Sequence, residues 1–204
     1  GKHFVGWEWI LLHRDFATPP PPGPRATMRV LVTGGGSDPR GLSVRFCDAL
    51  SLVPGSFETI VVTGPGFHHD DDLRAVLKQM RGPHSVRHAV ARMATIMAES
   101  DLALASFGTT AYELAAMGIP AVYVCISDDH AMSAELCANE GAAINLGVAD
   151  GASIASIVAA TSSLLNDEPR RRAMAKRGRE LVDGRGADRV AQLLLEAINA
   201  RQSN

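Results

Sequence analysis

The feature that most constrains the fold is a regular alternation of short apolar runs with amphipathic stretches from Arg29 onward. The apolar runs have strand length and end in glycine or polar residues, which is typical of buried parallel strands. They predict strands over residues 29–33, 58–63, a short segment centred on Val86, 101–106, 119–126 and 142–146. The amphipathic stretches predict helices over 41–50, from Asp70, 89–98, from Thr110, 131–139, 152–165, 168–182 and 187–200. This order predicts an α/β fold with a Rossmann-like, doubly wound parallel sheet.

The stretch from Ser100 to Pro120 leads a predicted strand into a helix through Phe107-Gly-Thr-Thr110. A helix that begins at the carboxyl edge of a sheet presents free N–H groups and the positive end of its dipole there, which favours a phosphate. Thr110 and Glu113 also have the spacing of a capping box. Thr109, Thr110 and Glu113 therefore either bind a phosphorylated ligand or only cap the helix, and the stretch alone leaves both open.

A second glycine-rich turn, Gly34-Gly-Gly-Ser37, follows the first predicted strand. Ligands of open α/β sheets bind at the carboxyl ends of the strands, where both turns are expected. The turn lacks the third glycine of a GxGxxG fingerprint, and no GxxxxGK[ST] loop is present, which excludes P-loop NTPases. Together the two turns and Glu113 predict a diphosphate held by backbone N–H groups and hydroxyls, with the Glu113 carboxylate accepting hydrogen bonds from ribose hydroxyls.

Composition excludes several other classes. A net charge of -2 and 5% aromatic residues argue against a nucleic-acid-binding surface, and the apolar runs are too short to span a membrane. Cys47, Cys125 and Cys137 show no CxxC spacing, so we expect no disulfide framework, no zinc site and three thiols packed as small apolar groups. We expect a soluble, cytoplasmic protein without metal or cofactor.

Two other polar clusters have ordinary interpretations. Residues 68–72, His-His-Asp-Asp-Asp, suggest a solvated helix start, because consecutive side chains point in different directions and do not converge on a metal. Ser106, Asp128 and His130 contain the residue types of a hydrolase triad, but the chain has no Gly-x-Ser-x-Gly elbow. We expect neither cluster to be catalytic.

The first 27 residues differ from the rest. Residues 1–16, hereafter the arm, are more apolar than a free tail, and Thr18-Pro-Pro-Pro-Pro-Gly-Pro24 predicts a stiff spacer. We expect residues 1–27 to be an arm and proline-rich linker from a missing amino-terminal domain, and residues 28–204 to form a nucleotide-sugar-binding domain. The arm, packing on something other than this domain, is then a candidate contact with a second copy of the chain in a homodimer.

Several motifs carry a family resemblance. They are Gly6-x-Glu8-Trp9-x-Leu11-Leu12-x-x-Asp15-Phe16, Val32-Thr-Gly-Gly-Gly-Ser-Asp-Pro39, Met97-Ala-Glu-Ser-Asp-Leu-Ala103, Gly108-Thr-Thr-x-x-Glu113, Gly118-Ile-Pro120, Asp128-Asp-His130 and Val182-Asp-Gly-Arg-Gly-Ala-x-Arg189-Val190. In this order they resemble the carboxyl-terminal half of the PseG/SpsG family, which contains UDP-sugar hydrolases of pseudaminic acid biosynthesis and spore-coat polysaccharide proteins. That family is similar to the nucleotide-binding half of MurG-like, GT-B glycosyltransferases.

The resemblance implies a GT-B carboxyl-terminal domain that binds the UDP moiety of a UDP-sugar. Glu113 would bind the ribose, the two turns the diphosphate, and the backbone around Val86 to His88 the uracil. The nucleotide-binding residues implied in this way are Gly35, Gly36, Ser37, Val86, His88, Gly108, Thr109, Thr110 and Glu113.

The chain departs from the family at two places. Phe107 replaces a glycine beside the phosphate turn, and Asp129-His130 replaces Asn-Gln, which puts a negative charge near the diphosphate. The general base of the family's hydrolases lies in the amino-terminal half, so no catalytic residue is assigned.

The resemblance predicts the UDP-sugar-binding part of an enzyme that hydrolyses a nucleotide-activated amino sugar in surface polysaccharide or nonulosonic acid biosynthesis. The alternatives are the nucleotide-binding half of a GT-B glycosyltransferase and a non-catalytic binding module. In each case we expect the chain alone to be inactive.

Overall fold

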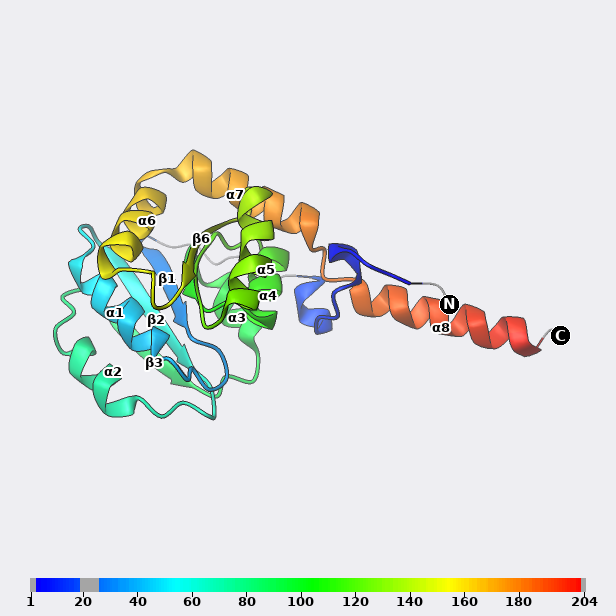
Figure 1. The fold of residues 1–204 in the computed structure, drawn as a ribbon, viewed down its shortest axis with the longest axis horizontal. Helices are drawn as coiled ribbons and strands as arrows, with labels where there is room; N and C mark the ends of the chain where they lie inside the picture. The colour runs from blue at the N-terminus through cyan, green and yellow to red at the C-terminus, as the bar shows by residue number, and fades with distance from the viewer. Residues whose placement is uncertain (1–2, 19–25, 203–204) are drawn as a thin grey trace.

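The computed structural model describes residues 3–18 and 26–202, and it contains a six-stranded parallel sheet with the order β3-β2-β1-β4-β5-β6 (Figure 1). The strands are β1 (Met28–Thr33), β2 (Phe57–Thr63), β3 (His84–His88), β4 (Leu102–Ala105), β5 (Ala121–Cys125) and β6 (Ala143–Val148). The chain winds outward from β1 in one direction and, after β3, from β4 in the other. The predicted Rossmann-like, doubly wound sheet is therefore confirmed.

Helices cover both faces of this sheet. They are α1 (Leu42–Leu52), α2 (Asp70–Leu77), α3 (Met93–Ala98), α4 (Thr109–Met117), α5 (Asp128–Asn139), α6 (Ile154–Asn166), α7 (Glu168–Leu181) and α8 (Gly186–Gln202). Successive side chains of a strand point to opposite faces. Val30 and Val32 accordingly pack with α1, α2 and α6, whereas Leu31 packs with α3, α4 and α5.

The change in winding direction occurs between β1 and β4. Thr33 at the end of β1 pairs with Ala105 at the end of β4, and the Ser106 N–H donates to the Thr33 carbonyl over 3.2 Å. Both predicted turns begin at these two ends, so the fold brings them together at the carboxyl edge of the sheet.

Several predicted helix starts differ from the observed ones. The helices expected from residues 41, 152 and 187 begin at Leu42, Ile154 and Gly186, and three others differ for an identifiable local reason. The helix expected from Ala89 begins at Met93, because Ala89 has a left-handed backbone with φ 48°. α5 begins at Asp128, three residues early, because the Ser127 hydroxyl caps it by accepting from the His130 N–H. α4 begins one residue earlier than expected, with Thr109 and Thr110 inside its first turn and Gly108 as N-cap without a side-chain hydrogen bond, so the expected capping box does not form.

The arm packs on its own domain, which corrects the expectation that it packs elsewhere. Its described part contains the 3-10 turns η1 (Trp7–Trp9) and η2 (Arg14–Phe16). Leu12 and Phe16 are buried in the same core as α4, and the Trp7 ring lies edge-on to Tyr112 with centroids 6.1 Å apart. The proline-rich spacer lies, except for Thr18, outside the described residues.

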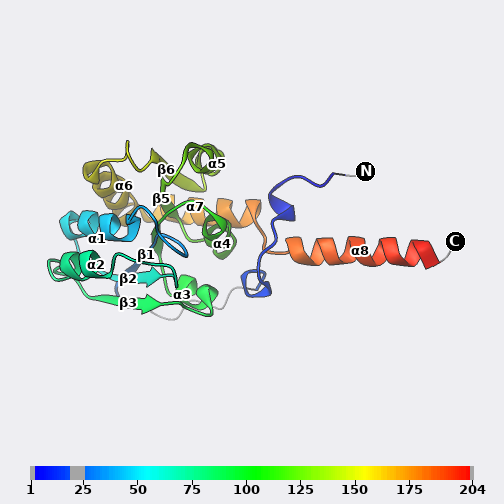
Figure 2. The same ribbon diagram turned by 60° about the horizontal axis from the view of Figure 1, so that its bottom comes forward.

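The motif from Asp183 to Arg189 holds the arm in place. A Cβ on Gly184 would lie 2.6 Å from the Phe16 carbonyl oxygen and one on Gly186 2.2 Å from the Ile10 oxygen, so only glycine permits this approach. The Arg189 guanidinium donates to the Glu8 carbonyl at 2.9 Å and to the Asp183 carboxylate at 2.8 Å. Beyond this junction α8 projects away from the sheet beside the amino-terminal segment (Figures 1 and 2).

The described part of the chain contains no helix with the length and apolar character needed to cross a membrane. Nor does it bring together three or more His, Cys, Asp or Glu side chains in a group able to hold a metal ion. Cys47, Cys125 and Cys137 are free and buried, as predicted, and burial raises their thiol pKa values to about 12, 11 and 12.

Candidate functional site

The first turn, Gly34 to Ser37, is supported by the side chain of Asp38. The buried Asp38 carboxylate accepts from the backbone N–H groups of Leu42 at 2.7 Å and Ser43 at 2.8 Å. It therefore caps α1 with a negative charge, and the amino end of this helix is not open to a phosphate. The open face of the turn is formed by Gly35, half-buried with φ 88°, and by the exposed Gly36 and Ser37.

A loop after β2 supports the same turn from the side. The Gly66 N–H donates to the Gly36 carbonyl at 3.0 Å, and a Cβ on Gly64 would lie only 2.2 Å from that oxygen. Glycine at position 64 thus permits direct backbone packing of the two loops. This contact defines the position of Gly36, and no local sequence pattern indicates it because the two loops are far apart along the chain.

The second turn, Phe107 to Thr110, lies at the end of β4 and leads into α4. Among the described residues no side chain caps α4, and a Cβ on Gly108 would meet no atom within 4 Å, so there is open space at the N-cap of this helix. Phe107 does not stand over this space. Its ring is buried beneath the turn, edge-on to Tyr112 and Tyr123 with centroids 5.6 and 5.3 Å apart. The bulky substitution noted in the sequence therefore leaves the turn accessible.

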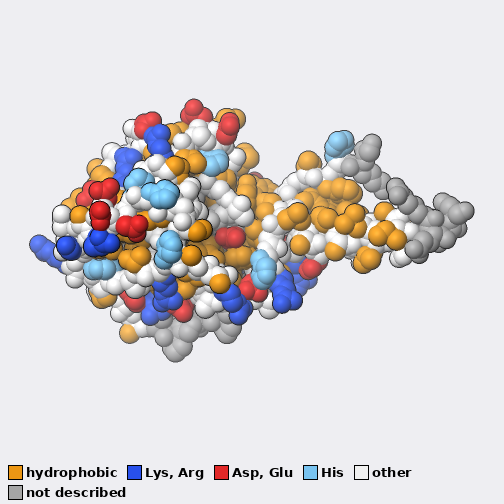
Figure 3. Space-filling view, turned by 90° about the horizontal axis from the view of Figure 1, so that it is seen from below, with side chains coloured by type: hydrophobic (Ala, Val, Ile, Leu, Met, Phe, Trp, Pro, Cys, Tyr) orange, Lys and Arg blue, Asp and Glu red, His pale blue; other side chains and the backbone are white. Residues whose placement is uncertain are grey.

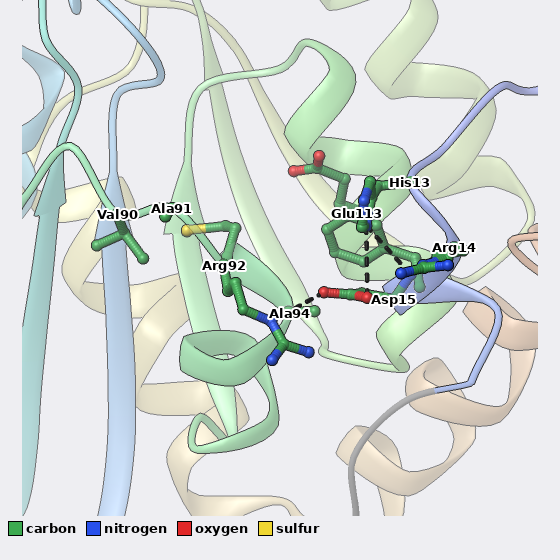
Figure 4. A pocket seen from close by; sticks show the side chains of 10 residues that line it. His13, Arg14, Asp15, Val90, Ala91, Arg92, Ala94 and Glu113 are labelled. Atoms are coloured by element: carbon green, nitrogen blue, oxygen red, sulfur yellow. Dashed lines mark hydrogen bonds and ion pairs between the residues drawn. The ribbon is translucent and has the colours of Figure 1, made fainter.

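Glu113 follows one turn later on α4 and lines a cavity of about 500 Å³ (Figure 4). Its carboxylate is half-buried, and burial raises its pKa. Within the described residues Glu113 makes no hydrogen bond or ion pair, so nothing in the fold compensates this desolvated group. An uncompensated carboxylate facing a cavity is typical of a ligand-binding residue.

The other walls of the cavity were not foreseen in the sequence. They come from residues 90–94, which form the loop after β3 and the start of α3, and from residues 13–16 of the arm. Val86 and His88, expected to meet the base, lie on the edge strand β3 and do not line the cavity, and the His88 ring is 3.1 Å from the Thr63 hydroxyl. No motif in the sequence marks residues 90–94, which reach the site because they lead from β3 into α3, the helix that packs beside α4.

The residues at the start of α5 lie at the carboxyl end of the next strand. Asp128 and Asp129 are exposed in the first turn of α5, where their charges suit the helix dipole. His130 is half-buried, and its buried Nδ1 has no hydrogen-bond partner among the described residues. No hydrogen bond therefore joins His130 to Ser106 or Asp128, and the triad geometry is absent.

Comparison with known proteins places this arrangement in a family. The profile of the glycosyltransferase family 28 C-terminal domain matches residues 29–190. The spore coat polysaccharide biosynthesis protein SpsG of Bacillus subtilis is 26% identical over 195 residues, which cover 94% of this chain and 57% of that protein. The UDP-N-acetylglucosamine--N-acetylmuramyl-(pentapeptide) pyrophosphoryl-undecaprenol N-acetylglucosamine transferase of Leuconostoc citreum is 26% identical, with 97% of this chain and 52% of that protein covered.

Among solved structures, Acinetobacter baumannii MurG is similar in fold, with a TM-score of 0.76 and 19% identity. The match covers 89% of this chain and 55% of MurG. The chain thus spans little more than half the length of each of these proteins. The predicted resemblance to SpsG and to MurG-like GT-B proteins is confirmed.

Proposed function

Because the chain belongs to the family of glycosyltransferase family 28 C-terminal domains, we propose that it is the nucleotide-binding half of a GT-B glycosyltransferase that uses a UDP-sugar. The observation that carries this proposal is the meeting of two open glycine-rich turns at the switch point of the sheet, beside the uncompensated carboxylate of Glu113. The relative from Leuconostoc citreum, whose name specifies UDP-N-acetylglucosamine, supports UDP as the nucleotide.

The geometry supports the following contacts. The diphosphate lies between the exposed face of Gly35 to Ser37 and the uncapped start of α4, where Gly108 to Thr110 supply N–H groups, hydroxyls and the positive helix end. Glu113 accepts hydrogen bonds from the ribose hydroxyls. The leaving group of glycosyl transfer is this diphosphate, so oriented dipoles that bind it also stabilise the charge that develops on it.

The sugar then extends toward the carboxyl ends of β4 and β5, near Asp129 and His130. Two exposed acidic groups at the start of α5, Asp128 and Asp129, disfavour a negatively charged sugar there and suit hydroxyl or amine substituents. This leaves the reacting carbon outside the domain, so the acceptor and a catalytic base belong on another domain.

The part of the chain that projects from the sheet, formed by the arm and α8, supports the proposal of a two-domain protein. Figure 3 shows apolar side chains gathered on it, and the exposed ones include Phe4, Leu11, Leu194, Leu195 and Ile198. Exposed apolar patches of this kind mark interaction surfaces. We assign this apolar surface of the arm and α8 to contact with an amino-terminal domain. Residues 28–204, together with the arm that packs on them, bind the nucleotide.

The test of nucleotide binding is calorimetric titration of the chain with UDP, ADP and GDP. We expect UDP to bind most tightly, and no detectable UDP binding at about millimolar concentration would remove the proposal.

Product analysis distinguishes the two reactions. In a protein that also contains the amino-terminal domain, transfer releases UDP from a UDP-sugar only when an acceptor is present, whereas hydrolysis releases UDP and free sugar without one. The chain alone is expected to give neither. Steady turnover by the chain that disappears with Thr110→Ala would show that the active site is complete within it.

A further inference from the structure

The cavity beside Glu113 is closed by two segments that are remote in sequence. One wall is residues 90–94, the loop after β3 with the start of α3, and the other is residues 13–16 of the arm. In Figure 4 the Glu113 side chain lies between these walls, with Val90 and Ala91 on one side and His13 and Asp15 on the other. A ligand that fills this space must contact both segments.

An ion pair between Arg92 and Asp15 joins the two walls. Arg92 Nε donates to Asp15 Oδ2 at 3.1 Å, and the Asp15 side chain is only 20% exposed whereas Arg92 is 72% exposed. The His13 ring lies on the other side of Asp15, where its Nδ1 accepts a hydrogen bond from the Asp15 backbone N–H at 3.3 Å and lies 3.5 Å from Asp15 Oδ1. Leu12 and Phe16, both buried in the core, anchor the arm segment at its two ends. The segment therefore has two apolar anchors and one charged connection to the opposite wall.

Resting on the function proposed above, we propose that Asp15 and Arg92 are positioning residues that hold the arm over the nucleoside part of the bound nucleotide. Asp15 and Arg92 carry opposite charges, so the ion pair adds no net charge to the site. Its effect is to define the distance between the walls and to limit the access of water to Glu113. Hydrogen bonds to a carboxylate are stronger where water is excluded.

Two explanations of Arg92 give opposite predictions for Asp15. If Arg92 served only as a positive charge that attracts the anionic nucleotide, removing the Asp15 charge would leave Arg92 unpaired and tighten UDP binding. If the pair positions the arm, Asp15→Asn weakens UDP binding although it makes the site more positive. The sign of one measurement therefore separates the two.

The experiment is calorimetry with UDP on the chain and on Asp15→Asn, Arg92→Gln and the exchanged pair Asp15→Arg with Arg92→Asp. Because one partner of the pair is exposed, we expect each single variant to weaken UDP binding by about two- to fivefold. The exchanged pair should recover most of this loss. Arg74→Gln is the matched control, since Arg74 is similarly exposed and pairs with Asp71 at 2.7 Å on α2, outside the cavity lining.

Hydrogen exchange gives a second readout that overall stability does not reproduce. UDP should slow exchange at the backbone amides of residues 13–17 in the original chain, and less so in Asp15→Asn. Tighter or unchanged UDP binding in Asp15→Asn, or no UDP-dependent protection of the arm, would overturn the inference while leaving nucleotide binding intact. Absence of UDP binding by the original chain would overturn both.

Discussion

Replacing the Glu113 carboxylate is expected to weaken nucleotide binding without weakening the fold. The group is half-buried, burial raises its pKa, and no partner in the described chain compensates it. A hydrogen bond to a charged group contributes about 1.5 to 3 kcal/mol, so Glu113→Ala should weaken UDP binding by about ten- to 150-fold. Glu113→Gln keeps one neutral acceptor in the same shape, and its loss should be smaller.

The same substitution that weakens UDP binding is not expected to lower the stability of the fold. A carboxyl whose folded pKa lies above its unfolded pKa binds more protons in the folded state, so this group lowers stability as pH rises through that interval. The Gln side chain does not titrate. At neutral pH the thermal midpoint of Glu113→Gln should therefore equal or exceed that of the original chain.

The pH dependence of binding follows from the same group. Only the ionised carboxylate accepts both hydrogen bonds, so affinity should fall as pH decreases through the raised pKa of Glu113. UDP-N-acetylglucosamine is the suitable ligand, because its diphosphate is a diester, whereas the terminal phosphate of UDP titrates near pH 6.

Two results would refute this reasoning. If Glu113→Gln and Glu113→Ala bound UDP within twofold of the original chain, Glu113 would not be a nucleotide contact. If instead their thermal midpoints fell by several degrees, the residue would be a helix-capping or packing group, contrary to the absence of a capping hydrogen bond in α4. Calorimetry and differential scanning fluorimetry on the same samples provide both measurements.

Three further predictions concern the supports of the site. Asp38→Ala should lower the free energy of unfolding in urea by about 1 to 2 kcal/mol, because the first N–H groups of α1 lose their cap, and an unchanged urea midpoint would contradict that role. Gly64→Ala should cost about 1 to 3 kcal/mol and weaken UDP binding, because its Cβ would displace the Gly36 carbonyl; undisturbed UDP affinity would show that the turn does not contact the nucleotide. The Arg189 guanidinium lowers the pKa of Asp183 from 3.8 to about 2, so the stabilisation that Asp183→Asn removes is present above about pH 4 and is lost as pH falls toward 2. If the difference in thermal midpoint between the original chain and Asp183→Asn stayed constant as pH falls from about 4 toward 2, that result would argue against the ion pair.

Much of the fold could be derived from local patterns. The strand-sized apolar runs and the amphipathic stretches between them were sufficient to predict a doubly wound parallel sheet, because parallel strands need helical crossovers and their hydrophobic periodicity is visible in the sequence. The same alternation predicted that the turns after residues 33 and 106 meet at one edge. Glu113 was identified by its spacing from Thr109 and Thr110, which places all three on one short helix.

Tertiary contacts decided what these local patterns left ambiguous. Thr110 and Glu113 have the spacing of a capping box, yet only the folded α4 shows that its first turn is uncapped and open. The apolar arm and the proline-rich spacer after it predict packing on another domain, but Leu12 and Phe16 are buried beside α4 once the chain folds.

The cavity itself depends on contacts between remote segments. Residues 13–16 and 90–94 become two walls of one site only through the sheet order and the glycine contacts of Gly184 and Gly186 with the arm. Such contacts depend on shape and distance between segments that local periodicity does not encode. The sequence by itself therefore determined the fold class and the helix that carries Glu113, and the tertiary structure decided which residues surround that carboxylate.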